Sequence, residues 1–465
     1  MSSRASDGSR LHIVLVPGFG GFDALGRLHY YAGVTPVFRE WQAEDPDDPR
    51  RARAVLHYFD NLPTAAVSTR AERLRRYLAR RVVRNEIQRG DTVALVGHST
   101  GGLDIRWMLW TLLADPNAVK WLDGSTENAV PVRNDDVRGR VKRVVFLSVP
   151  QRGTNIADWL SAYEMPRRFL AEALSEAVHD SGRRRDRSLG EWLTKNLAEW
   201  VDADLFRAAQ DVLIETDAAR FAPDSMDAVE AREAYTRLWL WSSGIAADFN
   251  ALSDLMCARP SGDLRSPVHL SDEQRTWERS VWRERGIATR SYATVSRCPF
   301  ERRVLDERQP WVWWDLRTFP EVGLVPDARE WSDVFYRFCY RACLSGPFML
   351  ADGPGVATMF GTGEKRRVEV WENDGIVNTA SMLSPGDDDT LLVECDHGDI
   401  IGHYKLARMP PDDQHRAGAA AKPHCGRRYH TYDLLRSGST FGDEEFRKVW
   451  RDIFDFCVSD NGTAA

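Results

Sequence analysis

The first 150 residues alternate between short apolar runs and longer amphipathic segments. β-rich runs occupy residues 11–16, 52–59, 92–96 and 141–149, whereas residues 69–82 (TRAERLRRYLARRV) repeat their apolar positions with the period of a helix. Strands that alternate with helices pair in parallel, because each helix returns the chain to the same end of the sheet. The pattern therefore predicts an α/β fold with a mainly parallel central sheet and flanking helices.

The pattern changes in the middle of the chain, where a long, charged and mostly helical segment separates two strand-rich parts. Strand patterns resume at residues 289–296, 366–371 and 390–396. We therefore expect three parts: a first part of the α/β core over 1–152, an inserted helical cap over 153–290, and the second part of the core over 291–465.

The last clear element is the segment 441–456 (FGDEEFRKVWRDIFDF). Its apolar residues recur three and four positions apart, so they share one face of a helix. That face suits packing on the sheet. It comprises Phe446, Val449, Trp450, Ile453 and Phe454.

Composition narrows the expected partners. The 465 residues carry a formal net charge of −7 with both signs spread along the chain, which predicts no nucleic-acid partner. No run of 18 apolar residues occurs, so no transmembrane segment is expected. The first residues show no apolar segment followed by a cleavage site, which predicts a cytoplasmic protein, or a secreted one if a signal peptide has been removed. The seven cysteines have irregular spacing and are expected to be thiols, with a single disulfide as the alternative.

One serine lies between two glycines at the end of an apolar run. In GHSTG, Ser99 follows the β-rich residues 92–96 and precedes the helical pattern LDIRWMLWTLL. Gly97 and Gly101 permit a sharp turn from strand to helix, on which the serine hydroxyl stands above the sheet. Ser99 is therefore the candidate nucleophile. The alternative is a structural turn in which the serine only caps the helix.

A serine hydroxyl is a weak nucleophile until a base removes its proton, so this turn requires a histidine and an acid that orients it. In folds of this kind the acid and then the histidine follow the serine along the chain, each after a strand. ENDGIVN places Asp374 after one late strand, and ECDHGDI places His397 after the next. The rival residues are His403, His424, His430, Glu372 and Asp396.

Backbone N–H groups must stabilise the negative charge that develops on a substrate oxygen. The expected donors are the N–H of Thr100, directly after the nucleophile, and that of Phe19 in the glycine-rich loop VPGFGGF. A phosphate-binding loop is the alternative interpretation of this segment, but its spacing is not G-x-G-x-x-G. We therefore expect an oxyanion hole and no nucleotide at this loop.

Six blocks of the sequence resemble the bacterial true lipases of the α/β-hydrolase superfamily, most closely the thermoalkalophilic lipases. In chain order they are VLVPGFGGF, HYYAGV, GHSTGGLDIR, VPQRGTNIADW, ENDGIVNTASM and DHGDIIG. The resemblance implies an α/β-hydrolase fold, a triad of Ser99, Asp374 and His397, and oxyanion donors at Phe19 and Thr100. The cap and the C-terminal loop match that family poorly.

The same resemblance bears on metals. Related lipases hold a structural calcium ion through an acid two residues past the catalytic histidine, which is the position of Asp399. Asp352 stands near the position at which the other branch of the true lipases has a second calcium-binding carboxylate, and oxygen ligands suit Ca²⁺. Tyr404 and Lys405 replace later ligands of the subgroup. The subgroup's zinc is not expected, because no histidine pair stands in its zinc motif, and no cofactor is expected for catalysis.

Together these residues predict a serine hydrolase that cleaves a carboxylic ester through an acyl-enzyme. Lipid-like or other apolar esters are the substrates that the resemblance implies. A thioesterase, an amidase or an acyltransferase would use the same triad, whereas a catalytically silent binding protein is disfavoured because every triad position is filled. If the cap is a lid over an apolar cleft, hydrolysis should accelerate as a substrate passes its solubility limit. The sequence makes no prediction about the oligomeric state.

Overall fold

The computed structural model describes a central sheet, its flanking helices and the loops that connect them. The described residues are 9–19, 24–25, 28–61, 67–121, 130–157, 280–298, 336, 339–340, 343–344, 355–383, 390–405, 433–435 and 437–459. Residues 158–279 of the predicted cap lie outside this set, as do Asp352, His424 and His430. The division of the chain into three parts therefore stays a prediction.

Eight strands form one sheet, in which every neighbouring pair runs parallel except the pair that contains the edge strand β11. Their spatial order is β11 (Lys365–Arg367), β10 (Val356–Met359), β12 (Thr390–Glu394), β9 (Ala288–Val295), β8 (Val141–Leu147), β5 (Thr92–His98), β1 (Leu11–Val16) and β4 (Val55–Tyr58). The chain passes from β1 to β4 and then crosses to β5 on the other side of β1. Such a reversal of strand order leaves a crevice at the carboxyl ends of the strands, where α/β proteins bind ligands.

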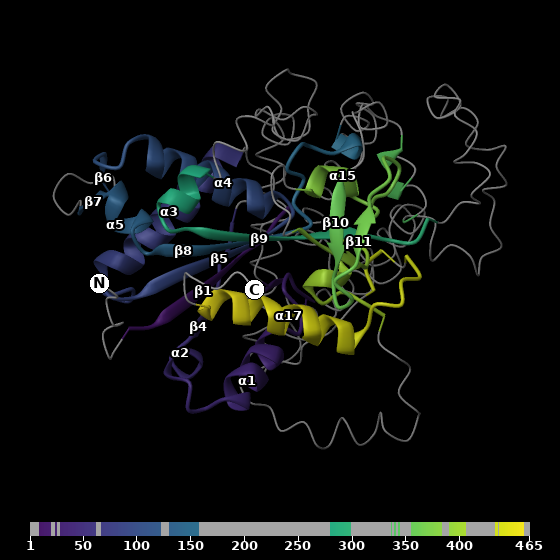
Figure 1. Cartoon of the computed structure of the whole chain (residues 1–465). Coiled ribbons are helices and arrows are strands. Elements are labelled where there is room, and N and C mark those ends of the chain that lie inside the picture. Colours follow the sequence, from purple (N-terminus) through teal and green to yellow (C-terminus); the bar gives the residue numbers. More distant parts are fainter. Residues whose placement is uncertain are drawn as a thin grey trace, which may run out of the picture.

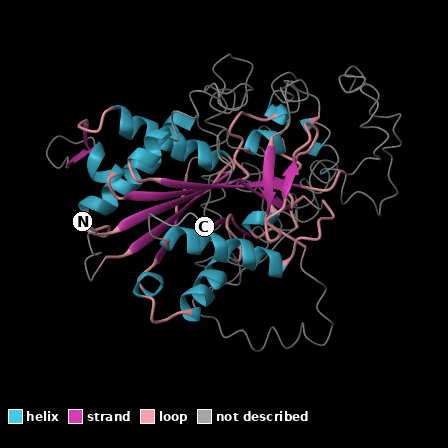
Figure 2. Cartoon of the chain, in the orientation of Figure 1, coloured by secondary structure: helices cyan, strands magenta, loops and turns pink. Residues whose placement is uncertain are grey.

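Helices cover both faces of this sheet (Figures 1 and 2). On one face lie α3 (Val67–Val83), α4 (Thr100–Ala114) and α5 (Asn134–Arg138), and on the other lie α1 (Val34–Glu44) and α17 (Asp443–Val458). The sheet order and the two helical layers are those of the α/β-hydrolase fold, which confirms the predicted fold class. None of the helices in the described ranges combines the length and the apolar composition that a membrane span requires.

Several shorter elements complete the described structure. They are β2 (Ala24–Leu25), β3 (Leu28–His29), α2 (Pro49–Ala52), β6 (Val119–Trp121), β7 (Pro131–Arg133), α15 (Thr379–Met382) and the 3-10 helix η5 (Asp399–Ile401). β2 pairs with β3 and β6 pairs with β7, each as an antiparallel ladder outside the main sheet.

Each face of the sheet has its own apolar core, because successive side chains of a strand point to opposite faces. Along β1, Val14 and Val16 belong to the core under α3 and α4, whereas Ile13 and Leu15 belong to the core under α1 and α17. All four are completely buried. β1 is therefore fixed from both sides, and so is the loop that follows it.

The predicted C-terminal helix is present, and all five residues of its predicted apolar face are buried. The helix packs against α1 and against the loop that precedes α1. The ring of Phe454 lies 5.2 Å from that of Phe38, and the ring of Trp450 lies 5.9 Å from that of Tyr31, measured between centroids. The aromatic contacts explain how the last helix of the chain closes one face of the sheet.

Strand prediction differed from the structure at one edge of the sheet. The strand expected over 366–371 is limited to β11 and pairs antiparallel with β10, which the sequence analysis missed. β10 has only four residues, and its first, Val356, is 58% exposed. A short strand at the edge of a sheet lacks the sustained apolar alternation on which such predictions depend.

A histidine pair, in which His12 is buried and His57 is half-buried, joins β1 to β4. His12 Nε2 lies 3.1 Å from Asp91 Oδ2, and His12 Nδ1 lies 2.9 Å from His57 Nε2. A carboxylate only accepts hydrogen bonds, so His12 carries its proton on Nε2 and accepts at Nδ1 from His57. Burial, followed by the charge of Arg81, lowers the pKa of His57 to about 3. Both rings are therefore neutral near pH 7.

Protonation of His57 is expected to destabilise the fold in acid. Because its pKa is about 3 in the folded state and about 6.5 in the unfolded chain, the unfolded state binds an extra proton between these values. The free energy of unfolding should fall as the pH decreases through this range. His57→Gln should reduce proton uptake on unfolding by about one proton, measured by urea unfolding at several pH values. An unchanged pH dependence would contradict a neutral histidine pair.

Candidate active site

Ser99 lies at the turn between β5 and α4, in a backbone conformation that residues other than glycine rarely adopt. Its φ is 53° and its ψ is −131°. Such a conformation costs roughly 1–3 kcal/mol and persists where the surroundings enforce it. Glycines make the turn possible: a Cβ on Gly101 would lie 2.6 Å from the Pro17 oxygen, and one on Gly97 would lie 2.8 Å from the Gly102 Cα. The turn is the one that the GHSTG pattern predicts.

The predicted oxyanion donors lie on the two segments that meet at Ser99. Thr100 is the first residue of α4, so its N–H has no acceptor within the helix. Phe19 lies three residues after β1, and its side chain is 42% exposed. Between these two, a Cβ on Gly18 would lie only 2.6 Å from the Ser99 Cβ. The loop after β1 and the first turn of α4 are therefore in contact beside the serine side chain.

Asp374 and His397 form a buried pair. His397 Nδ1 lies 2.7 Å from Asp374 Oδ2, and Asp374 is completely buried. The carboxylate also accepts hydrogen bonds from the Thr294 hydroxyl (2.6 Å) and from the N–H groups of Ile376 (3.0 Å) and Val377 (2.8 Å). A carboxylate fixed in this way holds the histidine proton on Nδ1, which leaves Nε2 as the basic nitrogen.

Ser99 and His397 follow β5 and β12, two parallel strands of one sheet, so both lie beyond its carboxyl edge. The ring of His98, next to the serine, has its centroid 4.5 Å from that of His397. Among the described residues, no hydrogen bond joins Ser99 Oγ to the His397 ring. Hydrogen bonds between a nucleophile and its base often tighten only when substrate is bound.

Two rival acids from the sequence analysis have other partners. Glu372 forms an ion pair with Arg366. Asp396 accepts hydrogen bonds from backbone N–H groups of its own loop. Asp374 bonds to no described histidine other than His397. The structure therefore brings together the acid and the histidine that the sequence analysis selected.

A chain of buried hydrogen bonds links the loop after β1 to His397. Gly18 N–H donates to Tyr30 Oη (2.7 Å), Tyr30 Oη lies 2.8 Å from His98 Nδ1, and His98 Nε2 lies 3.0 Å from the His397 carbonyl oxygen. A carbonyl only accepts, so His98 carries its proton on Nε2 and accepts at Nδ1 from the tyrosine. Every hydrogen bond in this chain therefore has one possible direction.

A buried ion pair supports the same loop from the opposite side. Arg70 of α3 and Asp104 of α4 are both completely buried, and Arg70 Nη2 lies 2.9 Å from Asp104 Oδ2. The same nitrogen donates to the carbonyl oxygens of Pro17 (3.2 Å) and Gly18 (3.0 Å). A buried charge requires an opposite charge and hydrogen-bond acceptors close to it, because it has lost its water. The loop that carries Phe19 is thus held by α3, although its own glycines would allow many conformations.

Sequence reasoning missed Tyr30, His98 and Arg70 as parts of the site. Tyr30 lies in the quoted block HYYAGV and His98 in the quoted elbow block, so both positions were marked without a role. Arg70 had no signal, because α3 contains six arginines and only the fold shows which of them are buried.

Three acidic residues cluster beside His397. Carboxylate oxygens of Asp396, Asp399 and Asp433 all lie within 4.8 Å of one another. Burial raises the pKa of Asp396, and burial together with the neighbouring Asp396 raises that of Asp399. Asp399, predicted as a calcium ligand, thus lies with two acids that the sequence analysis did not assign to a metal. Its predicted partner Asp352 is outside the described residues.

Comparison of the sequence with protein-family models and with curated proteins gives no match. Similar solved structures include Staphylococcus hyicus lipase (13% identity, 98% of this chain and 97% of that chain, TM-score 0.37) and lipase 1 from Pelosinus fermentans (15%, 84% and 93%, 0.32). Phospholipase PlaB from Legionella pneumophila is 17% identical over 32% of this chain at a TM-score of 0.22, and the match spans only 27% of that enzyme. The thermoalkalophilic subgroup stays a prediction from the sequence blocks.

His98 is expected to remain neutral, with its proton on Nε2, between about pH 5 and pH 8. Burial and the neighbouring His397 lower the pKa of His98 well below its usual range, and both of its ring nitrogens have fixed partners. Nitrogen-15 NMR of the histidine rings would test this, with His98→Asn to assign the signals. A proton on Nδ1, or titration near pH 6.5, would contradict the direction of the hydrogen-bond chain.

Proposed function

We propose that this protein is a serine hydrolase that cleaves carboxylic esters, with Ser99 as the nucleophile, His397 as the base and Asp374 as the acid that orients the base. The observation that carries the proposal is the 2.7 Å contact between His397 Nδ1 and Asp374 Oδ2, at the end of the sheet where Ser99 occupies a strained turn. A carboxylate on Nδ1 directs Nε2 to accept a proton, and the serine hydroxyl is the proton donor that this chemistry requires.

The reaction would begin with attack of Ser99 Oγ on the carbonyl carbon of the ester while His397 Nε2 takes the hydroxyl proton. The N–H groups of Phe19 and Thr100 would donate hydrogen bonds to the resulting oxyanion. His397 then returns the proton to the departing alcohol, which leaves an acyl group on Ser99. A water molecule, deprotonated by His397, attacks this acyl-enzyme, and the carboxylic acid leaves as Ser99 regains its proton.

Lipid-like or other apolar esters are the proposed substrates, because six sequence blocks resemble bacterial true lipases. The exposed side chain of Phe19 supports this choice, since it places an apolar ring beside a proposed oxyanion donor. A thioesterase, amidase or acyltransferase would use the same three catalytic groups. A lid formed by the predicted cap, without residues 288–290 that belong to β9 of the sheet, is part of the proposal only through the resemblance.

Ser99→Ala should reduce esterase activity by about a thousandfold or more, because loss of the nucleophile removes the acyl-enzyme route. Labelling by a fluorophosphonate probe should disappear as well. Ser68→Ala, which changes an exposed serine of α3, is the matched control and should retain both signals. If Ser99→Ala keeps more than a few per cent of the activity, or if labelling persists, Ser99 is not the nucleophile.

The substrate class is tested with p-nitrophenyl esters of graded chain length, a matched thioester and a matched anilide. We expect the esters to react fastest, with the rate rising with acyl length. Faster turnover of the thioester would identify a thioesterase, and faster turnover of the anilide would identify an amidase.

A triglyceride assayed across its solubility limit tests the predicted lid. A smooth saturation curve would reject the lid.

We also propose that Asp396, Asp399 and Asp433 hold a structural calcium ion. Asp396 and Asp399 are buried and Asp433 is half-buried. Carboxylates within 4.8 Å of one another repel, and a divalent cation with oxygen ligands would compensate this repulsion. Asp396 and Asp399 flank His397 in the chain. Calcium bound here would hold the loop that carries His397 and would take no part in bond making.

Calcium is therefore expected to raise the melting temperature by several degrees, since a ligand at a hundredfold excess over its Kd stabilises by about 2.7 kcal/mol. Asp399→Asn should abolish the increase, and magnesium should produce a smaller one because it prefers a tighter site. Asp47→Asn, which alters an exposed acid of another loop, is the control. Equal melting curves with calcium and with a chelator would contradict this site.

A further inference from the structure

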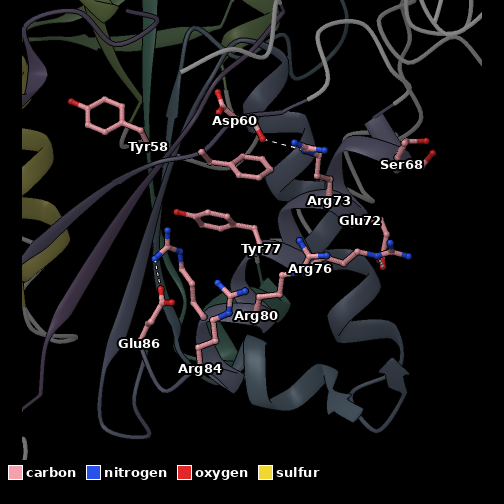
Figure 3. Close-up of a pocket in the computed structure, with 13 residues that line it drawn as sticks. Tyr58, Asp60, Ser68, Glu72, Arg73, Arg76, Tyr77, Arg80, Arg84 and Glu86 are labelled. Atoms are coloured by element: carbon pink, nitrogen blue, oxygen red, sulfur yellow. Dashed lines mark hydrogen bonds and ion pairs between the residues drawn. The ribbon is translucent and has the colours of Figure 1, made fainter. Parts of the chain in front are cut away.

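A groove of about 870 Å³ lies between α3 and the residues that end β4 (Figure 3). Its walls include the aromatic side chains of Phe59 and Tyr77, whose ring centroids are 5.0 Å apart. A smaller cavity of about 190 Å³ adjoins it and shares Ser68 and Glu72 with it. Cavities of roughly 300–1,000 Å³ are the size that binds small molecules. None of the catalytic residues proposed above lines either space.

The groove is basic although the chain is acidic. Five arginines and three acidic residues line it, whereas the whole chain has a formal net charge of −7. Figure 3 shows Arg73, Arg76, Arg80 and Arg84 following one another along α3 and its end. Their spacing of three and four residues places them on one side of the helix. All four are exposed, so this side of α3 presents a row of guanidinium groups.

The acidic residues of the groove are already engaged. Glu72 accepts hydrogen bonds from Arg75 (2.8 Å), Arg76 (3.1 Å) and Lys120 (3.1 Å). Burial opposes this charge, but the hydrogen bonds from Arg75 and Lys120 outweigh it and lower the pKa of Glu72 to about 2. One carboxylate thus accepts hydrogen bonds from three cationic side chains. The net charge of this group of four side chains is therefore positive.

Two arginines of the groove, Arg73 and Arg84, have no acidic partner among the described residues. Glu86 pairs with Arg81 at 2.6 Å. Within the described ranges, Arg73 and Arg84 form no ion pair, and Arg73 donates only to the backbone oxygen of Asp60 (3.2 Å). The groove therefore has more positive charge than its own acids compensate.

Two buried guanidinium N–H groups in these walls have no acceptor. They are Nη1 of Arg75 in the smaller cavity and Nε of Arg81 in the groove, and neither has a partner among the described residues. Arg75 is only 1% exposed. A buried donor without an acceptor costs roughly 1–3 kcal/mol, and more when it belongs to a charged group. Such donors point to an acceptor that a ligand supplies.

We propose that this groove binds an anion that carries at least two phosphate groups. Phosphate oxygens match the planar fork of arginine in two-point hydrogen bonds, and a row of arginines one helical turn apart suits successive phosphates better than a single carboxylate. The size of the groove favours a small phosphate compound or a lipid headgroup. The site does not depend on the proposed hydrolase activity, because it contains none of the groups assigned to that reaction.

The proposal is tested by isothermal titration calorimetry on the full chain, in low-salt buffer without divalent cations. The probes are inorganic pyrophosphate, ADP, and phosphatidylcholine vesicles that contain phosphatidate. The double variant Arg80→Gln/Arg84→Gln removes two exposed charges of the row and should weaken binding about tenfold or more, as expected for lost hydrogen bonds to charged groups. Its melting curve should match that of the wild type, because both side chains are exposed.

The matched control is Arg39→Gln/Arg367→Gln, which makes the same charge change on exposed arginines away from the groove. It should bind as the wild type does, and so should Ser99→Ala, which separates this site from the proposed catalysis. Binding of pyrophosphate and ADP identifies a soluble phosphate compound, and binding of the vesicles alone identifies a lipid headgroup. Equal weakening in the groove and control variants, or no saturable binding of any probe, would overturn the proposal.

Discussion

The backbone conformation of Ser99 is the constraint on which the rest of the site depends. A φ of 53° lets α4 begin directly after the serine, so that the first N–H groups of the helix lie beside its side chain. The turn is possible because Gly101 packs its Cα against the oxygens that end β1 and Gly102 packs against Val149. A side chain at Gly101 would push α4 away from the end of β1, and one at Gly102 would push it away from Val149, which follows β8. The proposed oxyanion donors would then lose their position relative to Ser99.

Three loops must keep fixed positions around this turn, and each is held by buried polar groups rather than by apolar packing alone. Tyr30 and His98 connect the loop after β1 to the backbone of His397, and Arg70 holds the same loop from α3. Asp374 is held by Thr294 at the end of β9. Because each of these bonds is buried, losing one leaves an unpaired polar group, which raises the cost of any displaced arrangement.

The sequence predicted the strands that are long and apolar, and it predicted the acid and the histidine that the structure brings together. These signals are local: a glycine pair, a turn, and the order of residues along the chain. Strand β10, next to the edge strand, and the partners of Asp399 were missed for a different reason. Asp433 lies 34 residues after Asp399 in the chain, and only the fold brings the two carboxylates together. Likewise, a net charge averaged over 465 residues hides a basic groove on one helix.

Helix α3 has a different task on each of its sides. Its buried side presents Arg70 to the backbone after β1, and its exposed side presents the arginine row to the groove. A ligand in the groove could move the loop after β1 only if α3 had two alternative positions in the protein and the ligand bound the protein more tightly with α3 in one of them. The ion pair of Arg70 with Asp104 and its bonds to two carbonyl oxygens hold the helix in one position. We therefore expect the proposed active site and the basic groove to share α3 as a rigid element without influencing each other.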